Sequence, residues 1–269
     1  MQLSLSNSLS RSRMGLDPAV TAFAAASGAT DLVGIDALVK YVRAQGLFNN
    51  FRLYPMKSAQ NAGSGSTVYG LGGLTTNDMT LVKSPTWGAS GIEFDGVNQY
   101  GSINDFLDSS TLTAWARWKF NSLAQAGSNV VLSQNEFTTN KRSWALSARN
   151  DLTDDPLTLA RSSDGTAVNT EVYREVTSSY STSERMYVAQ WIDGGGRQLW
   201  LDKASQTLAL EAGTALSTRY DADIAILVAA QAPNAPGGFS DAVSGAVVFL
   251  TDAITTTQRE AITDLINAL

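Results

Sequence analysis

The sequence predicts a mainly β protein, an antiparallel two-sheet sandwich or jelly roll, with a small helical hairpin before it and one helix at its C-terminal end. Short runs of alternating or β-branched residues recur from residue 79 onward, and turn residues separate them. No helical pattern lies between these runs, whereas parallel strands would need helical crossovers. We therefore expect antiparallel strands in two layers.

Composition excludes several classes of chemistry. The 269 residues include no cysteine and no histidine, which removes thiolate nucleophiles, disulfides, Cys/His zinc sites and imidazole bases. A serine hydrolase is excluded with them, since no histidine is present to take the serine proton. Nineteen Lys and Arg against 25 Asp and Glu give a net charge of −6, so we expect no nucleic-acid partner. The longest apolar run, 224–230, is too short to span a membrane, and no apolar block resembling a signal peptide opens the chain.

Residues 1–15 are expected to form an extended arm. Leucines alternate with serines in this segment and two arginines follow: Leu3, Leu5, Leu9, Arg11 and Arg13. The segment is either an edge strand that pairs with its own domain or an arm that pairs with a neighbouring subunit.

Residues 16–62 are expected to form a helical leader. Asp17 and Pro18 are suited to begin a short helix over 19–27, which ends at Gly28. A second helix begins near residue 30 and ends at Gly46, and its apolar residues share one stripe: Ile35, Leu38, Val39 and Val42. The stripe continues through 47–54, and packing against a large surface is favoured over ligand binding.

The sandwich is expected at 63–269, because 62–73 is rich in glycine and serine and indicates a boundary. The expected strands are 79–82, 91–95, 100–103, 111–120, 129–133, 142–149, 157–161, 186–193, 197–202, 224–230 and 245–250.

For some of these segments and for the C-terminal one, the sequence also predicts burial, turn type or position. In 111–120, even-numbered apolar residues such as Trp118 share one face and Trp115 lies on the other, so we expect one face to be core. Residues 193–196 form a glycine-rich hairpin turn, and 224–230 is a central strand covered on both faces. Residues 255–269 form a helix that we expect to seal an edge or an end of the sandwich.

Two motifs resemble those of concanavalin A-like (laminin G-like) jelly rolls. IEFDGVNQYGSI, at 92–103, resembles their opening strand pair with its F-D-G turn. YVAQWIDGGGRQLWLDK, at 187–203, resembles their late hairpin, although Lys203 and Ala204 replace the usual glycine turn. The resemblance implies a concanavalin A-like antiparallel sandwich.

The flanking segments resemble parts of tailed-bacteriophage and prophage structural proteins. AFAAASGATD and IDALVKYVRAQGLFNNFRLYP resemble their two-helix leader, and TTTQREAITDLINAL resembles their C-terminal helix. The resemblance implies a virion protein that decorates the head or belongs to the tail or adsorption apparatus.

Carboxylates suggest two kinds of chemistry. A retaining glycosidase needs two carboxyl groups about 5 Å apart, and the Glu-x-Asp-x-x-Glu pattern of endoglucanases in the resembled family does not occur here. Glu93 and Asp95 come nearest, but Asp95 is expected to accept backbone N–H groups at its turn. A second cluster is either a solvated turn or a calcium site, and calcium is the one cofactor we consider: Asp151, Asp154 and Asp155. Asp221 and Asp223 lack the spacing of a calcium loop.

Aromatic residues are candidates for stacking on a sugar ring. Four of them lie in expected strands: Trp115, Trp144, Trp191 and Trp200. Asn98 and Tyr100, beside the F-D-G turn, are further candidates. Tryptophans in strands are more often packed in a core, so both interpretations stay open.

Three functions follow from these observations. The first is a non-enzymatic virion structural protein, assembled in the host cytoplasm, with other virion proteins as partners and a homo-oligomeric form such as a trimer. The second is a carbohydrate-binding module that recognises surface glycans in host attachment, which is compatible with the first. The third, a glycan hydrolase, fits the residues least.

Overall fold

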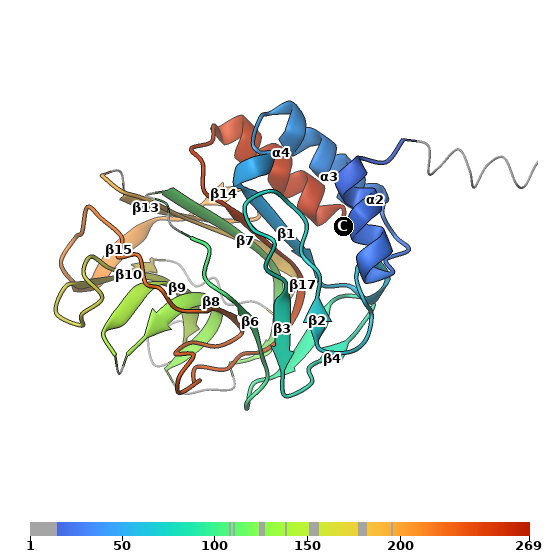
Figure 1. The fold of residues 1–269 in the computed structure, drawn as a ribbon. Helices are drawn as coiled ribbons and strands as arrows, with labels where there is room; N and C mark the ends of the chain where they lie inside the picture. The colour runs from blue at the N-terminus through green and yellow to red at the C-terminus, as the bar shows by residue number, and fades with distance from the viewer. Residues whose placement is uncertain are drawn as a thin grey trace, which may run out of the picture.

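The computed structural model describes residues 15–107, 109, 111–123, 127–137, 139–150, 156–176, 182–194 and 196–269. Two antiparallel sheets face each other, and the helices of these residues cover the outer face of one sheet (Figure 1). This architecture confirms the predicted mainly β sandwich with a helical hairpin before it and a helix at its C-terminal end. The predicted arm, 1–15, lies outside the described residues except for Gly15.

Sheet A is the eight-stranded sheet beneath the helices. Its spatial order is β14 (Ala204–Ser205), β13 (Gly196–Leu201), β12 (Arg185–Ile192), β7 (Thr111–Ser122), β17 (Asp241–Leu250), β5 (Ile92–Asp95) and β4 (Thr86–Trp87). The eighth strand, β1 (Phe51–Pro55), pairs with β17 beyond the stretch that pairs with β5.

Sheet B is the nine-stranded sheet opposite. Its spatial order is β15 (Leu208–Gly213), β11 (Thr170–Glu175), β10 (Leu157–Ser162), β9 (Lys141–Arg149), β8 (Ser128–Glu136), β16 (Ile226–Val228), β6 (Tyr100–Ile103), β3 (Met79–Val82) and β2 (Thr67–Val68). The expected central strand at 224–230 is confirmed as β16, which is buried and lies between β8 and β6.

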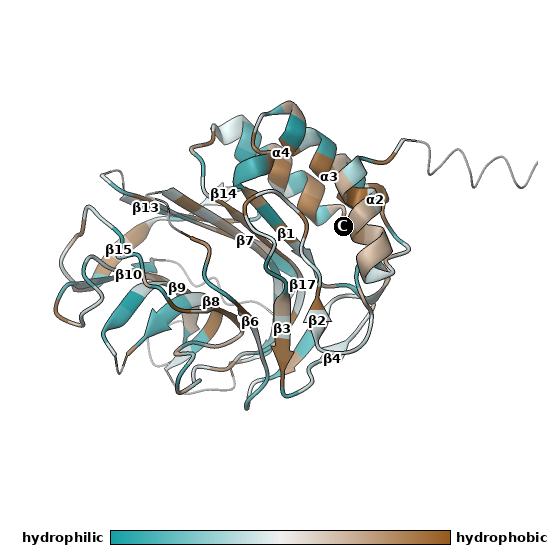
Figure 2. Ribbon diagram, viewed as in Figure 1, coloured by the Kyte–Doolittle hydropathy of each residue, from teal (hydrophilic) through white to brown (hydrophobic). Residues whose placement is uncertain are grey.

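The apolar side chains form two cores, one on each face of sheet A. Between the sheets, large aromatic side chains meet in edge-on and stacked contacts, for example Phe94 with Trp118 at 6.1 Å between ring centroids. Beneath the helices, Trp115, Val188 and Val248 belong to a second core. Both faces of β7 are therefore buried, whereas the sequence alone predicted one. In Figure 2 the covering helices carry hydrophobic and hydrophilic stretches side by side, as expected for helices that bury one face.

Two of the three described helices, α2 and α4, begin at the capping residues that the sequence predicts. α2 (Pro18–Ser27) begins after Asp17, whose carboxylate accepts the Ala19 N–H at 2.9 Å, and ends at Gly28 with φ of 74°. α3 (Val33–Ala44) lacks a side-chain cap and buries the predicted stripe. α4 (Thr256–Asn267) begins with a capping box in which Thr255 and Gln258 bond each other's backbone N–H. Short 3-10 turns occur at Phe48–Asn50 and Ser58–Gln60. Among the described residues no helix has the length and apolar character needed to cross a membrane.

The position predicted for the C-terminal helix was wrong. Instead of sealing an edge or an end, α4 lies beside α3 on the outer face of sheet A, where Thr263 contacts Trp115 of β7. The two predicted helical segments therefore form a single layer over sheet A.

Two further predictions are corrected. Residues 51–55, assigned to the leader 16–62, form β1, so the sandwich begins before residue 63. All five residues of β1 are buried, because Tyr54 enters the core between the sheets while Phe51 and Leu53 enter the core beneath the helices. The strand pair expected at 92–103 is divided between the sheets, with β5 in sheet A and β6 in sheet B.

The late hairpin is confirmed. β12 and β13 pair antiparallel from Tyr187 with Leu201 to Ile192 with Gly196. Lys203 and Ala204 replace the glycine turn usual in the resembled family, and just before them Asp202 takes the left-handed conformation with φ of 56°. Its carboxylate accepts the Met186 N–H at 3.0 Å. This turn leads into β14 and hence to the edge of sheet A.

Candidate binding hollow at the edge of sheet A

The structure buries the tryptophans predicted as sugar-stacking candidates. Trp144 and Trp191 lie between the sheets with ring centroids 5.1 Å apart. Trp115 lies beneath α4, and its indole N–H donates to Thr263 Oγ1 at 3.1 Å. The prediction that these three rings stack on a sugar was therefore wrong, because neighbouring side chains already fill the space beside them. Trp200 is 5% exposed and differs from them, because it lines a hollow.

Asn98 lies in the connection between β5 and β6, and Tyr100 is the first residue of β6. The Asn98 side chain is exposed, and its backbone N–H donates to Asp95 Oδ1 at 3.1 Å. The Tyr100 ring packs near Phe239, with 6.2 Å between ring centroids. Their role in sugar binding stays a prediction.

Of the two carboxylates considered for hydrolysis, Asp95 stabilises the same turn. Asp95 Oδ1 accepts N–H groups from Val97, Asn98 and Gln99 at 2.9, 3.1 and 3.2 Å, which confirms the predicted role of this side chain. Burial opposes ionisation of Asp95, but these three bonds outweigh it and hold the pKa of the carboxyl below its usual value. Glu93 lies on β5 with its side chain exposed.

The calcium prediction falls outside the described residues. Asp151, Asp154 and Asp155 all lie there. Within the described part of the chain, no three carboxylates gather closely enough to hold a metal ion.

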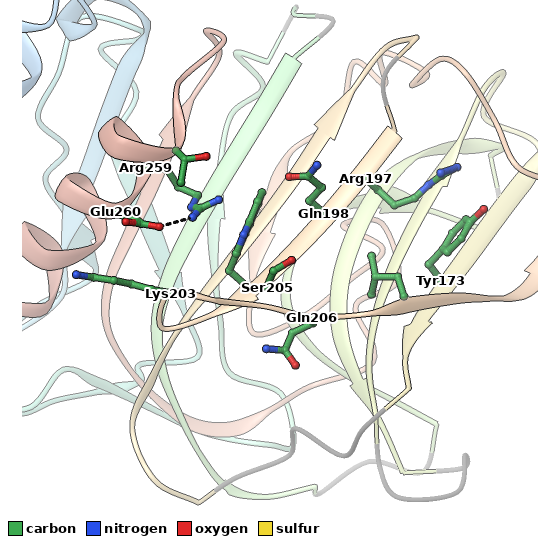
Figure 3. Close-up of a pocket in the computed structure, with 11 residues that line it drawn as sticks. Tyr173, Arg197, Gln198, Lys203, Ser205, Gln206, Arg259 and Glu260 are labelled. Atoms are coloured by element: carbon green, nitrogen blue, oxygen red, sulfur yellow. Dashed lines mark hydrogen bonds and ion pairs between the residues drawn. The ribbon is translucent and has the colours of Figure 1, made fainter.

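A hollow of about 650 Å³ lies where sheet A ends at β13 and β14 (Figure 3). Strand β13, the chain that passes from β14 to β15, the strand β11 of sheet B and the first turns of α4 all contribute to its wall. Most of the lining side chains are polar or charged: Tyr173, Arg197, Gln198, Trp200, Lys203, Ser205, Gln206, Leu208, Thr256, Arg259 and Glu260.

At the helix end of the hollow, an arginine lies over a tryptophan ring. The Arg259 guanidinium is 4.1 Å from the centroid of the Trp200 ring, and its Nη2 donates to Glu260 Oε1 at 3.1 Å. The Arg259 side chain is only 9% exposed. Burial lowers the pKa of the Arg259 guanidinium, and the Glu260 carboxylate offsets this only in part.

At the opposite end, a second arginine lies on a tyrosine. The Arg197 guanidinium is 4.0 Å from the centroid of the Tyr173 ring. Its Nε and Nη2 donate to the buried Glu171 carboxylate at 2.8 and 2.9 Å, a bidentate pair that fixes the plane of the guanidinium. Figure 3 shows these two residues side by side, with Gln198 between them and Arg259.

Solved structures with a similar arrangement of strands include enzymes and a receptor-binding domain. A Trypanosoma rangeli sialidase in complex with sialic acid has a TM-score of 0.59 at 11% identity, covering 86% of this chain and 39% of that chain. The receptor binding domain of botulinum neurotoxin mosaic serotype C/D has a TM-score of 0.53 at 9% identity, covering 81% and 51%. These likenesses show the fold alone. This chain spans about two fifths of the sialidase and half of the toxin domain. No family model matches the sequence, and no curated protein matches it.

Part of the lining of this hollow belongs to a segment that the sequence analysis identified. Arg197, Gln198, Trp200 and Lys203 all belong to the segment at 187–203 that resembles a late hairpin. Nothing in the sequence pattern joined them to Tyr173 or Arg259, which come from β11 and α4.

Proposed function

We propose that the chain is a non-catalytic glycan-binding module, and that it is displayed on the surface of a virion. The observation that carries the glycan proposal is the hollow beside β13, whose wall offers amide, hydroxyl, guanidinium and ammonium donors on fixed elements. Sugar hydroxyls are recognised by such groups, placed in a concave site.

The carboxylate content of the hollow favours binding over hydrolysis. Glu260 is the single carboxylate among the described residues that line the hollow, and it accepts a hydrogen bond from Arg259. Glycoside hydrolysis requires a pair of carboxyl groups on either side of the scissile bond. A hydrolase built on Glu93 and Asp95 has less support, because Asp95 is engaged by the backbone of its own turn.

Two of the similar structures also support a binding function. One similar structure is a sialidase with sialic acid bound, and another is the receptor binding domain of a toxin. Proteins that share this arrangement of strands thus include one that holds a sugar and one that binds a receptor.

The virion role is proposed from the resemblance of the leader and the C-terminal helix to phage structural proteins. On this proposal the partners are other virion proteins and copies of the same chain, and the glycan belongs to the host surface. Head decoration and a place in the tail or adsorption apparatus are both compatible with it.

The glycan proposal is tested by filling the hollow. Ser205→Trp places a large side chain at an exposed position of the wall, and Ser64→Trp makes the same change at an exposed position of a loop that does not line it. On a glycan array, the wild type and Ser64→Trp are expected to bind the same glycans, while Ser205→Trp loses at least about tenfold in affinity. Equal binding by all three proteins, or binding by none, would contradict the proposal.

A further inference from the structure

We infer that the hollow selects acidic glycans, whose carboxylate or sulfate oxygens contact Lys203 and Arg259. This inference rests on the proposed glycan-binding function and adds the class of ligand. It concerns a local property of the hollow, because the chain as a whole carries a net charge of −6.

The first argument is the charge of the wall. Among the lining residues that the structure describes, three side chains are cationic, Arg197, Lys203 and Arg259, against one carboxylate, Glu260. The acids that pair with Arg197 and Lys203 are Glu171 and Asp264, and neither belongs to the lining. The three cations therefore line the space that a ligand would occupy, whereas the carboxylates paired with Arg197 and Lys203 are not among the described lining residues.

The second argument is what covers the aromatic rings. A neutral sugar is usually held by stacking on an exposed aromatic face, with its hydroxyls bonded around it. Here the Arg259 guanidinium covers Trp200 at 4.1 Å and the Arg197 guanidinium covers Tyr173 at 4.0 Å. The rings instead hold the guanidinium planes in place, and planar guanidinium groups suit carboxylate and sulfate oxygens.

The third argument is that the charge of Arg259 is incompletely compensated. The Arg259 side chain is 9% exposed, it has one carboxylate partner among the described residues, and burial lowers its pKa. Thr256, the first residue of α4, also lines the hollow, so the positive end of the helix dipole faces the same space. An anionic ligand would restore to Arg259 the interactions that burial removed.

The test compares matched glycans and matched lysines. The probes are carboxylate-bearing and sulfate-bearing glycans printed beside their neutral parents. Lys203→Gln removes an exposed cation of the wall that pairs with an aspartate, and Lys40→Gln removes a similarly exposed, aspartate-paired lysine of α3. Arg259→Lys keeps the charge but loses the planar group that lies on Trp200. Thermal unfolding of each variant checks that it is folded.

We expect the wild type to prefer the acidic member of each pair by about tenfold or more, the usual effect of a charge-assisted hydrogen bond. Lys203→Gln and Arg259→Lys should both reduce this preference, and Lys40→Gln should leave it unchanged. Added salt should weaken binding of the acidic glycans more than that of their parents.

Three other outcomes would overturn one or both proposals. Equal binding of acidic and neutral members, lost in Ser205→Trp, would overturn the acidic selectivity and leave the glycan-binding function standing. An acidic preference that survives both Lys203→Gln and Arg259→Lys would overturn the assignment to these side chains. No binding to any glycan would overturn both proposals.

Discussion

At the turn between β5 and β6, one carboxylate oxygen of Asp95 accepts three backbone N–H groups. Because these bonds hold the pKa of Asp95 below 3.8, the ionised form is favoured in the folded state. The stabilisation is therefore present above about pH 4 and is lost as the pH falls through the lowered pKa. Asp95→Ala should reduce the free energy of unfolding at pH 7 by about 1 kcal/mol, the usual net contribution of a hydrogen bond, because the side chain is exposed.

Chemical denaturation at pH 7 and at pH 3 or below measures this effect. The difference between wild type and Asp95→Ala should shrink at the lower pH. Asp95→Asn is the control, because its amide oxygen keeps an acceptor without a titrating charge. A difference that persists unchanged at low pH would show that ionisation of Asp95 contributes nothing.

The tryptophans of β7 show which property of a single residue the sequence does not predict. The alternation of β7 correctly separated Trp115 from Trp118, since successive side chains point to opposite faces. Whether the second face was covered depended on α4, which lies almost 150 residues further along the chain. Residue-level patterns predict the direction of a side chain more reliably than the elements that cover it.

At the scale of elements, the layer of helices is tied to sheet A by a buried polar contact. The Trp115 indole donates to Thr263 Oγ1, and this hydroxyl donates in turn to the Arg259 carbonyl at 2.9 Å. Thr263→Val keeps the shape of the side chain but leaves the buried indole N–H without its acceptor. We expect a loss of about 1–3 kcal/mol in the free energy of unfolding, measured by denaturation followed through tryptophan fluorescence.

Thr263→Ser restores the acceptor and should recover part of that loss. Thr257→Ala, at an exposed position of the same helix, should change stability by no more than about 0.5 kcal/mol. If Thr263→Val were as stable as the wild type, the contact would contribute nothing to holding the helix on the sheet.

Elements with a complete local signal were predicted, and those without one were missed. The β12–β13 hairpin combines two apolar runs with a glycine-rich turn, and α4 has its capping box within four residues. None of the residues of β15 is buried and all of those of β1 are, so neither strand shows a two-residue alternation of polar and apolar residues. β14 has two residues, which is too few for a pattern.

At the scale of the whole molecule, the hollow arises where three distant parts of the chain meet. Tyr173 comes from β11, Arg197 and Trp200 from β13, and Arg259 from α4. No spacing within the sequence relates these three segments. The sequence therefore predicted the hairpin that carries part of the site, whereas the other lining residues could be identified only from the folded structure.

The proposed assembly of several copies is a second property at this scale. If residues 1–13 pair with a neighbouring subunit, their removal should reduce the mass of the particle in solution to that of the monomer, 28.6 kDa less the deleted segment. Light scattering coupled to size exclusion gives that mass. An assembly that keeps its size without residues 1–13 would contradict the subunit-pairing role, as would a full-length chain that is already monomeric.

The most direct test of the account is a crystal structure of the protein with the glycan that binds best. The account predicts an intact saccharide in the hollow beside β13, with its acidic group against Lys203 and Arg259. A saccharide bound on another surface, or one cleaved in the crystal, would contradict it.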